Sequence, residues 1–146
     1  MTEFKKIVVP LDFSNHSNRA LDVAIDLAKK FGGRIHLIHA YPIHPILLSP
    51  YDMHLPVDFE REFRKASDLQ MAACAERVRK ADVAVETTCT PDLPSEAIVR
   101  CVEKIGADLV VMGTRGLTGL KHVVLGSVAE RTLRTAPCPV LTVKAS

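Results

Sequence analysis

The stretch of this 146-residue chain best suited to chemistry is the glycine-rich segment 112–128, which reads Met-Gly-Thr-Arg-Gly-Leu-Thr-Gly-Leu-Lys-His-Val-Val-Leu-Gly-Ser-Val. It holds four of the seven glycines, together with the basic residues Arg115, Lys121 and His122. Glycines let backbone N–H groups approach an oxyanion closely. Gly126 and Ser127 open a predicted helix, whose first turn offers unpaired N–H donors and the positive end of the helix dipole. The segment therefore predicts a phosphate-binding loop.

The same segment also admits a purely structural interpretation. Ser127 and Glu130 match the S-x-x-E pattern of a capping box, with the glycines serving as turns. We expect this box to form, and it does not exclude phosphate, because the backbone donors of the first helical turn can still face a ligand. His122 could contact a phosphate or be an ordinary loop residue, and the Walker A pattern GxxxxGK[ST] does not occur.

A second candidate stretch is Pro10-Leu11-Asp12-Phe13-Ser14, which follows the first apolar run. It contains no glycine, so the GxGxxG fingerprint of dinucleotide binding is absent. Two anions repel each other, so Asp12 is better suited to accept hydrogen bonds from ribose hydroxyls, or to orient a metal, than to touch phosphate. Alternatively, Asp12 merely caps the helix that follows. The local sequence favours neither interpretation.

Both stretches follow apolar runs that predict strands, within a regular alternation of strands and amphipathic helices. Strands are expected at 6–11, 34–40, 83–89, 109–112 and 140–143, and helices at 14–31, 57–80, 94–105 and 127–135. This alternation predicts an α/β fold, a parallel sheet with helices on both faces. In such a sheet ligands bind beyond the carboxyl ends of the strands, where the strand order switches. We expect that place to be the loops after the first and fourth strands.

The character of each strand predicts its position in the sheet. The runs 6–11 and 109–112 are continuously apolar, as central strands should be, whereas 83–89 alternates and suits an edge. Pro10 cannot donate to a central ladder, so we place it at the carboxyl end of its strand. The helix 57–80 is expected to turn Phe59, Phe63, Ala66 and Ala73 inward.

Composition excludes several classes of protein. Lys and Arg number 19 against 17 Asp and Glu, and a net charge of +2 is too small to predict nucleic acid as a partner. No apolar run approaches the roughly 18 residues of a membrane span. The apolar core that follows Lys6 is also shorter than the about 7–15 residues of a signal peptide, so a cytoplasmic location is expected. The length predicts one domain, 1–146.

The cysteines and two strand histidines are expected to be structural. Cys74, Cys89, Cys101 and Cys138 form no CxxC pair and no zinc pattern, so we interpret them as packing thiols. His36 and His39 are separated by an odd number of residues along a strand. They therefore point to opposite faces of the sheet and cannot chelate one metal together. We expect His39 to be a core or strand-end histidine.

The pattern Gly113-x2-Gly116-x9-Gly126-Ser127 resembles the ATP-binding signature of the universal stress protein family, G-x2-G-x9-G-[ST]. Three further segments match that family: Val9-Pro10-Leu11-Asp12-Phe13-Ser14, Leu37-Ile38-His39-Ala40 and Ala136-Pro137-Cys138-Pro139-Val140. The resemblance covers nearly the whole chain. It implies a single Rossmann-like three-layer domain with a five-stranded parallel sheet in the order 3-2-1-4-5, usually dimeric, with ATP bound in a subset of members.

Carried over position by position, the resemblance implies a complete nucleotide site. Pro10 and Asp12 would line the adenosine end with Asp12 on the ribose, Ala40 would contact the adenine edge through its backbone, and Met112 would flank the adenosine. The phosphates would be held by Gly113, Gly116, Gly126, Ser127 and the Val128 amide. Arg115 lies in the same loop, although the signature does not fix its role. Ala129 stands where ATP-binding members often have a hydroxyl residue, which weakens a contact to the terminal phosphate.

Three functions compete for this site. The first is an ATP-binding regulatory or stress-response protein, in which ATP, with or without Mg²⁺, sets a state and is hydrolysed slowly at most. No residue pair near the loop presents a convincing general base with a positioned water. The second is a nucleotide-metabolising enzyme that uses the same cleft with Asp12 on a metal. The third is an interaction module without a nucleotide, against which the intact glycine signature argues.

Two further segments suggest contacts. The segment Tyr41 to Pro56 holds four prolines and, after Tyr41, seven large apolar residues, so we expect it to fold over the cleft as a lid or to pack on a partner subunit. The short β-branched run Val140 to Val143 is expected to be a sheet edge that pairs with its own copy about a two-fold axis. A homodimer with one ATP per subunit is the predicted assembly.

Overall fold

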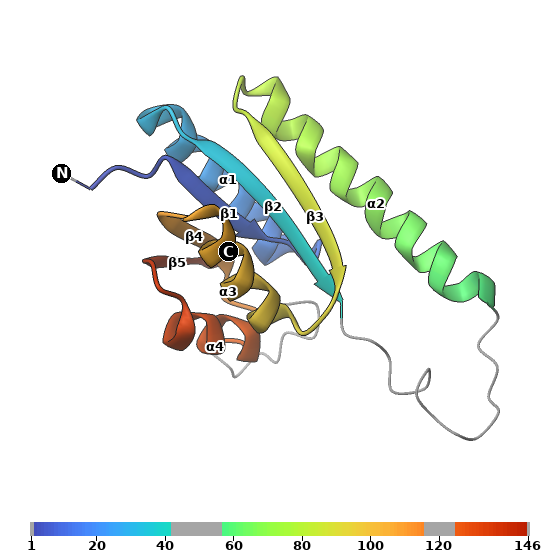
Figure 1. Cartoon of the computed structure of the whole chain (residues 1–146). Helices are drawn as coiled ribbons and strands as arrows, with labels where there is room; N and C mark the ends of the chain where they lie inside the picture. Colours follow the sequence, from blue (N-terminus) through green and yellow to red (C-terminus); the bar gives the residue numbers. More distant parts are fainter. Residues whose placement is uncertain (1, 42–56, 116–124, 146) are drawn as a thin grey trace.

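A computed structural model describes residues 2–41, 57–115 and 125–145, with only the backbone at 57–60. Its elements follow one another in the order β1 (Lys6–Pro10), α1 (Asn15–Phe31), β2 (Arg34–Tyr41), α2 (Val57–Lys80), β3 (Val85–Pro91), α3 (Pro94–Ile105), β4 (Leu109–Gly113), α4 (Ser127–Thr135) and β5 (Val140–Val143). The strands form one parallel sheet in the order β3-β2-β1-β4-β5 (Figure 1). The predicted α/β fold and strand order are confirmed. The segment 42–56, for which a lid or partner contact was predicted, lies outside the described residues.

Two apolar cores, one on each face of the sheet, hold the helices. Buried residues of α1 and α2, among them Leu21 and Val78, pack with Ile7 and Leu37 on one face. Buried residues of α3 and α4 pack with Val8, Val110 and Met112 on the other. Alternate residues of the central strands supply both cores, because successive side chains of a strand point to opposite faces. The arrangement is the predicted three-layer one.

The predicted strand positions are confirmed. β1 lies at the centre of the sheet with Ile7, Val8 and Val9 fully buried, and it ends at Pro10. Beyond the proline, the Leu11 N–H returns to the ladder and donates to the Ile38 carbonyl at 2.8 Å. β3 is an edge strand, but it runs from Val85 to Pro91, two residues later than predicted. The offset arises because the preceding turn places Asp82 in the left-handed conformation and ties the Val83 N–H to the Val78 carbonyl.

The predicted inward face of α2 is wrong. Phe63 is 45% exposed, and Ala66 and Ala73 are also exposed, whereas the side chain of Phe59 lies outside the described part. The residues that face the sheet are instead Ser67, Met71, Cys74, Ala75 and Val78. The predicted stripe also contains Gln70 and Arg77, whereas the buried stripe stays small or apolar to the end of the helix. The helix therefore turns the second stripe to the sheet.

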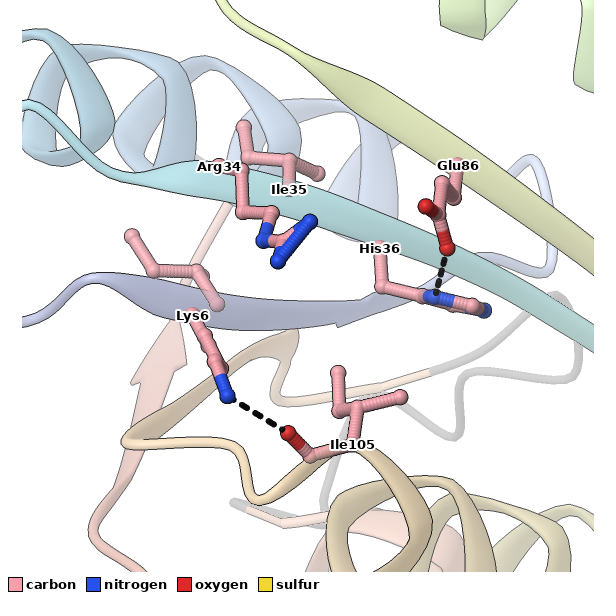
Figure 2. A pocket seen from close by; sticks show the side chains of 7 residues that line it. Lys6, Arg34, Ile35, His36, Glu86 and Ile105 are labelled. Atoms are coloured by element: carbon pink, nitrogen blue, oxygen red, sulfur yellow. Dashed lines mark hydrogen bonds and ion pairs between the residues drawn. The ribbon is translucent and has the colours of Figure 1, made fainter.

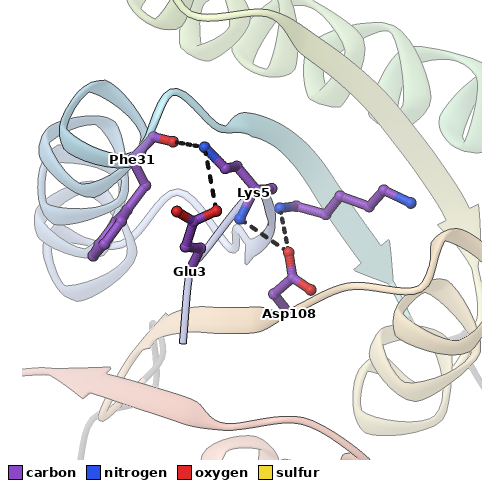
Figure 3. Close-up of polar contacts among 5 residues, drawn as sticks. Glu3, Lys5, Phe31 and Asp108 are labelled. Atoms are coloured by element: carbon purple, nitrogen blue, oxygen red, sulfur yellow. Dashed lines mark hydrogen bonds and ion pairs between the residues drawn. The ribbon is translucent and has the colours of Figure 1, made fainter. Parts of the chain in front are cut away.

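Glycine caps and an aspartate tie the amino edge of the sheet together. α1 and α3 end at Gly32 and Gly106, both in the left-handed conformation that glycine adopts without penalty. Asp108 Oδ2 accepts the N–H groups of Lys5 and Lys6 at 2.9 and 2.8 Å, which joins the start of β1 to β4 (Figure 3). The Lys5 ammonium contacts the Phe31 carbonyl and lies 3.6 Å from Glu3. None of the helices in the described part is long and apolar enough to cross a membrane.

Candidate functional site

The candidate site lies at the carboxyl edge of the sheet, between β1 and β4. These strands are neighbours, but the chain leaves β1 towards α1 on one face and leaves β4 towards α4 on the other. This is the topological switch point at which open parallel sheets bind their ligands. The fold therefore brings together the two stretches that the sequence singled out, the loop after Pro10 and the loop after Gly113.

The first loop is held by hydrogen bonds within the chain. Asp12 is half-buried, and its Oδ1 accepts the Ser14 N–H at 3.0 Å. Ser14, not Asp12, is the N-cap of α1, because its Oγ accepts the Ser17 N–H at 3.2 Å. Asp12 therefore stabilises the turn that leads into the helix rather than capping the helix itself.

Phe13 adopts a conformation that costs energy. Its φ is 65°, in the left-handed region that bulky residues avoid, at a typical cost of about 1–3 kcal/mol. Its ring packs on His39 at a centroid distance of 4.6 Å. Backbone strain of this kind gathers at binding and active sites, where the surrounding structure imposes it.

His39 belongs to the core, as predicted. It is buried, and its Nδ1 lies 2.7 Å from the Leu11 carbonyl oxygen, so Nδ1 carries the proton and donates it. Its ring continues a row of aromatic contacts to Tyr41 at 6.0 Å and from there to Phe63 at 5.5 Å. His36 points to the opposite face, where Nε2 lies 2.8 Å from Thr88 Oγ1. The prediction that the two histidines point to opposite faces of the sheet is confirmed.

Gly113 packs more tightly than any side chain would allow. A Cβ at this position would lie 2.7 Å from the Cβ of His16 and 2.8 Å from its backbone carbon. The first turn of α1 can therefore approach β4 only because residue 113 is glycine. His16 also accepts the Ala145 N–H at 3.1 Å on Nδ1, which binds the end of the chain to the same corner.

The two ends of the second loop meet at Thr114, which is buried. Its N–H donates to the Val143 carbonyl at 3.0 Å, and its own carbonyl accepts the Gly126 N–H at 2.6 Å. The Gly126 amide is thus engaged within the protein. The N–H groups of Ser127, Val128 and Ala129 follow in the first turn of α4, where an α-helix provides no internal acceptor.

The predicted capping box does not form. The N-cap of α4 is Gly126, with extended backbone angles, and no side chain caps the helix. The Gly126 carbonyl already accepts the Glu130 N–H at 2.9 Å, so Ser127 is the first helical residue and not the cap. Glu130 pairs with Arg134 instead. The box is out of frame by one residue, and the N-cap residue offers no side-chain acceptor to the first-turn donors.

Arg115 is the basic residue that the structure places in this loop. The residue is half-buried, yet its Nε is buried and has no hydrogen-bond partner among the described residues. A buried guanidinium N–H without an acceptor lowers the stability of the protein, unless a ligand accepts its hydrogen bond. The sequence placed Arg115 in the predicted binding loop without fixing its contact, because burial of one side-chain nitrogen leaves no trace in a sequence. Gly116, Lys121 and His122 lie outside the described residues.

The remaining predicted residues lie around the two loops. Pro10 and Ala40 are half-buried at the carboxyl ends of β1 and β2. Met112 is buried on the α3 and α4 side, and Val128 packs against the same core. Ala129 is 2% exposed within that core, so a hydroxyl at this position would meet apolar side chains.

The cysteines do not add to the site. All four are free, Cys74 is buried and the other three are half-buried. Burial is the main cause that raises the pKa of each thiol above its ordinary value. A thiol with a raised pKa is a poor nucleophile at neutral pH. The interpretation as packing thiols agrees with these environments.

Comparisons with known proteins agree on one family. Residues 3–144 match the model of the universal stress protein family. The universal stress protein MJ0531 of Methanocaldococcus jannaschii is 36% identical, over 97% of this chain and 82% of that protein. The solved structure of MJ0577 from the same organism is 26% identical with a TM-score of 0.85, covering 98% of this chain and 97% of that one.

A further solved structure is of a universal stress protein in complex with cAMP. It is 25% identical to this chain, covers 97% of both chains and superposes with a TM-score of 0.68. Related structures of this fold thus include a nucleotide complex. The chain belongs to the universal stress protein family.

Proposed function

We propose that this protein binds ATP at the carboxyl edge of its sheet and that the bound nucleotide sets a regulatory, stress-related state. The observation that carries the proposal is the set of unsatisfied donors at the switch point: the buried Nε of Arg115, which has no partner among the described residues, and the uncapped first turn of α4. Donors of this kind suit a phosphate chain. A relative with a cAMP ligand supports a nucleotide at this fold.

The adenosine end of the proposed site lies at β1 and β2. The Asp12 carboxylate suits ribose hydroxyls, while the Ala40 backbone would contact the adenine edge. Pro10 and Met112 would flank the nucleoside. All four residues lie at or just beyond the carboxyl ends of adjacent strands. The site would thus bind the nucleoside on one side of the switch point and the phosphates on the other.

The phosphate end would combine backbone and side-chain donors. The amides of Ser127 and Val128 and the guanidinium of Arg115 would donate to phosphate oxygens. Gly126 would act through its small size and extended conformation, because its own amide already donates to the Thr114 carbonyl. Gly113 contributes the close packing that sets the position of α1, and Gly116 completes the signature.

Two titratable groups at this edge already make hydrogen bonds within the protein. His39 donates Nδ1–H to the Leu11 carbonyl, and Asp12 accepts the Ser14 amide. A general base needs a lone pair directed at a reacting water. Slow hydrolysis with Mg²⁺ is the second candidate function, favoured by the carboxylate of Asp12 at the ligand-binding edge.

We also propose that the whole chain, 1–146, acts as one cytoplasmic nucleotide-binding domain that dimerises through β5. This strand is the sheet edge opposite β3, and its Leu141 side chain is 39% exposed. An edge strand with free N–H and C=O groups is a template for pairing with a second copy. Such pairing would join two sheets and leave each switch point accessible.

The experiment that tests the function starts from protein purified without added nucleotide. Mass spectrometry identifies any nucleotide that co-purifies, and calorimetry compares ATP with AMP. We expect ATP to bind clearly more tightly than AMP, and ATP incubated for hours with Mg²⁺ to remain intact. Rapid turnover would establish the enzymatic alternative, and equal affinity for ATP and AMP would refute the phosphate assignment.

A further inference from the structure

A second hollow lies at the amino edge of the sheet, the edge opposite the switch point. It is a pocket of about 220 Å³ between the first residues of β1 and β2, the edge strand β3 and the end of α3. Figure 2 shows the side chains that line it, with Lys6 and Arg34 on the sheet, Glu86 beside His36, and Ile105 at the end of α3. The nucleotide proposal uses none of these residues.

The pocket places two cations side by side. Lys6 and Arg34 are partners in the parallel register of β1 and β2. Neighbouring strands lie only about 4.8 Å apart, so the two side chains stand next to each other on one face of the sheet. Like charges directly opposite in a sheet repel each other and destabilise the pair. An anion between them would remove that repulsion.

The cations differ in how the protein uses them. Lys6 Nζ donates to the Ile105 carbonyl at 3.1 Å, which holds its ammonium at the end of α3 (Figure 2). An ammonium has three donors, so this bond leaves others available. Arg34 is exposed, and the described residues offer it no ion-pair partner. Its planar guanidinium can bind two oxygens of one anion at once.

The charges around the pocket are predominantly positive. Lys6 and Arg34 line the pocket with one carboxylate, Glu86. Outside the lining, Lys104 acts on His36, and the Asp108 carboxylate accepts the Lys6 backbone N–H at 2.8 Å. Glu86 Oε2 lies 3.8 Å from His36 Nδ1, so this carboxylate is drawn towards the histidine. The pocket therefore presents a net positive charge, with a fork-shaped donor on one strand and a point-charge donor on the next.

We propose that this pocket binds a small dianionic oxyanion of the phosphate class, held by Arg34 and Lys6. Phosphate fits better than a single carboxylate because its tetrahedral oxygens can accept donors that come from two strands at once. A pocket of about 220 Å³ has room for such an ion and its hydration. This inference stands apart from the nucleotide proposal, since the two sites lie at opposite edges of the sheet.

His36 makes the binding depend on pH. Burial is the main cause that lowers the pKa of His36 below its ordinary value, with Lys104 lowering it further and Glu86 raising it. A bound anion would stabilise the protonated imidazole and raise that pKa. By linkage, the anion must then bind more tightly at a pH below the His36 pKa than above it. Thr88, which bonds to Nε2, carries no charge and does not alter this sign.

The test uses sulfate as the probe, because its charge stays constant across the pH range of histidine titration. Sulfate is added at pH 8 and pH 5.5 while NMR follows the His36 ring and the Arg34 side chain, with sodium chloride at matched ionic strength as the reference. We expect saturable sulfate shifts at both residues, tighter sulfate binding as His36 becomes protonated, and saturable shifts with inorganic phosphate at pH 8, where phosphate is a dianion. Shifts that chloride reproduces would overturn the proposal.

Variants localise the site. Arg34→Gln should lower the affinity for sulfate at least tenfold, and Arg34→Lys should lower it less. Glu86→Gln, which removes a negative charge, should raise that affinity. The matched control is Arg61→Gln, which removes an exposed arginine on α2 and should change nothing. Unchanged affinity in Arg34→Gln, or shifts confined to residues 125–129, would refute this pocket. Gly126→Asp, a change at the proposed nucleotide site, should leave the His36 response intact.

Discussion

Replacing Gly113 by alanine tests whether a single close approach positions both the fold and the ligand site. The new Cβ would lie 2.7 Å from the His16 Cβ and 2.8 Å from the His16 backbone carbon. Carbon atoms attract best at about 3.5–4.0 Å, so the first turn of α1 must retreat by about 0.8 Å. A backbone contact cannot be relieved by rotating a side chain. We expect the free energy of unfolding to fall by about 1–3 kcal/mol.

The retreat of α1 should also weaken nucleotide binding. The first turn of α1 carries the Ser14 amide that donates to Asp12 Oδ1, so the proposed ribose contact moves with the helix. Loss of one charge-assisted hydrogen bond would weaken ATP binding by about tenfold or more. Thermal unfolding and calorimetry measure the two effects separately, with the melting temperature expected to fall by roughly 3–10 °C.

The matched control is Gly106→Ala. Gly106 has a φ of +66°, but the nearest heavy atom to an added Cβ is Lys6 Nζ at 4.0 Å. Alanine there pays only for the left-handed conformation, about 1–2 kcal/mol, at the far edge of the sheet. It should therefore lower stability and leave ATP affinity unchanged. If Gly113→Ala melted within a degree of the wild type, the close approach of α1 to β4 would be refuted.

Three further predictions address the phosphate end and the proposed dimer. Gly126→Asp should abolish ATP binding without loss of stability, because aspartate is a favoured N-cap at the extended conformation of residue 126 and its charge repels phosphate. Gly126→Asn is the uncharged control, and retained ATP affinity of Gly126→Asp in calorimetry would argue against the site. Arg115→Gln should lower the affinity for ATP by roughly 10–100-fold and the affinity for AMP much less. Arg131→Gln, on the exposed face of α4, should alter neither affinity. Leu141→Lys should convert a dimer to monomer in sedimentation, while Leu69→Lys on α2, where the side chain is 65% exposed, should not; a wild type that is monomeric at micromolar concentration would contradict the assembly.

What the sequence predicted well is what local pattern determines. Continuous apolar runs correctly predicted that β1 and β4 lie inside the sheet, because polar side chains are costly to bury on a strand covered on both faces. The predicted helix ends at residues 31 and 105 are confirmed, and the glycines that follow them, Gly32 and Gly106, adopt the left-handed conformation. The strand order itself came from the family resemblance and not from periodicity.

Two predictions failed where a local side-chain pattern was compatible with more than one arrangement. The face that α2 buries was misassigned because two stripes of small or apolar residues compete, and the predicted stripe also contains Gln70 and Arg77. The capping box at Ser127 failed because the Gly126 carbonyl accepts the Glu130 N–H, which makes Gly126 the N-cap and Ser127 the first helical residue. Here a backbone hydrogen bond, which is the same for every residue type, overruled a side-chain pattern.

Gly113 shows why a motif can be correct while its local explanation is incomplete. The sequence predicted that this glycine binds phosphate, whereas the structure shows that it packs closely against His16 on α1. The two roles are compatible, because the helix that the glycine admits follows directly on the loop that carries Asp12. A glycine at this position would thus set the distance between the ribose end and the phosphate end of the proposed site. The spacing of the signature then reflects the geometry of the switch point as well as the chemistry of the ligand.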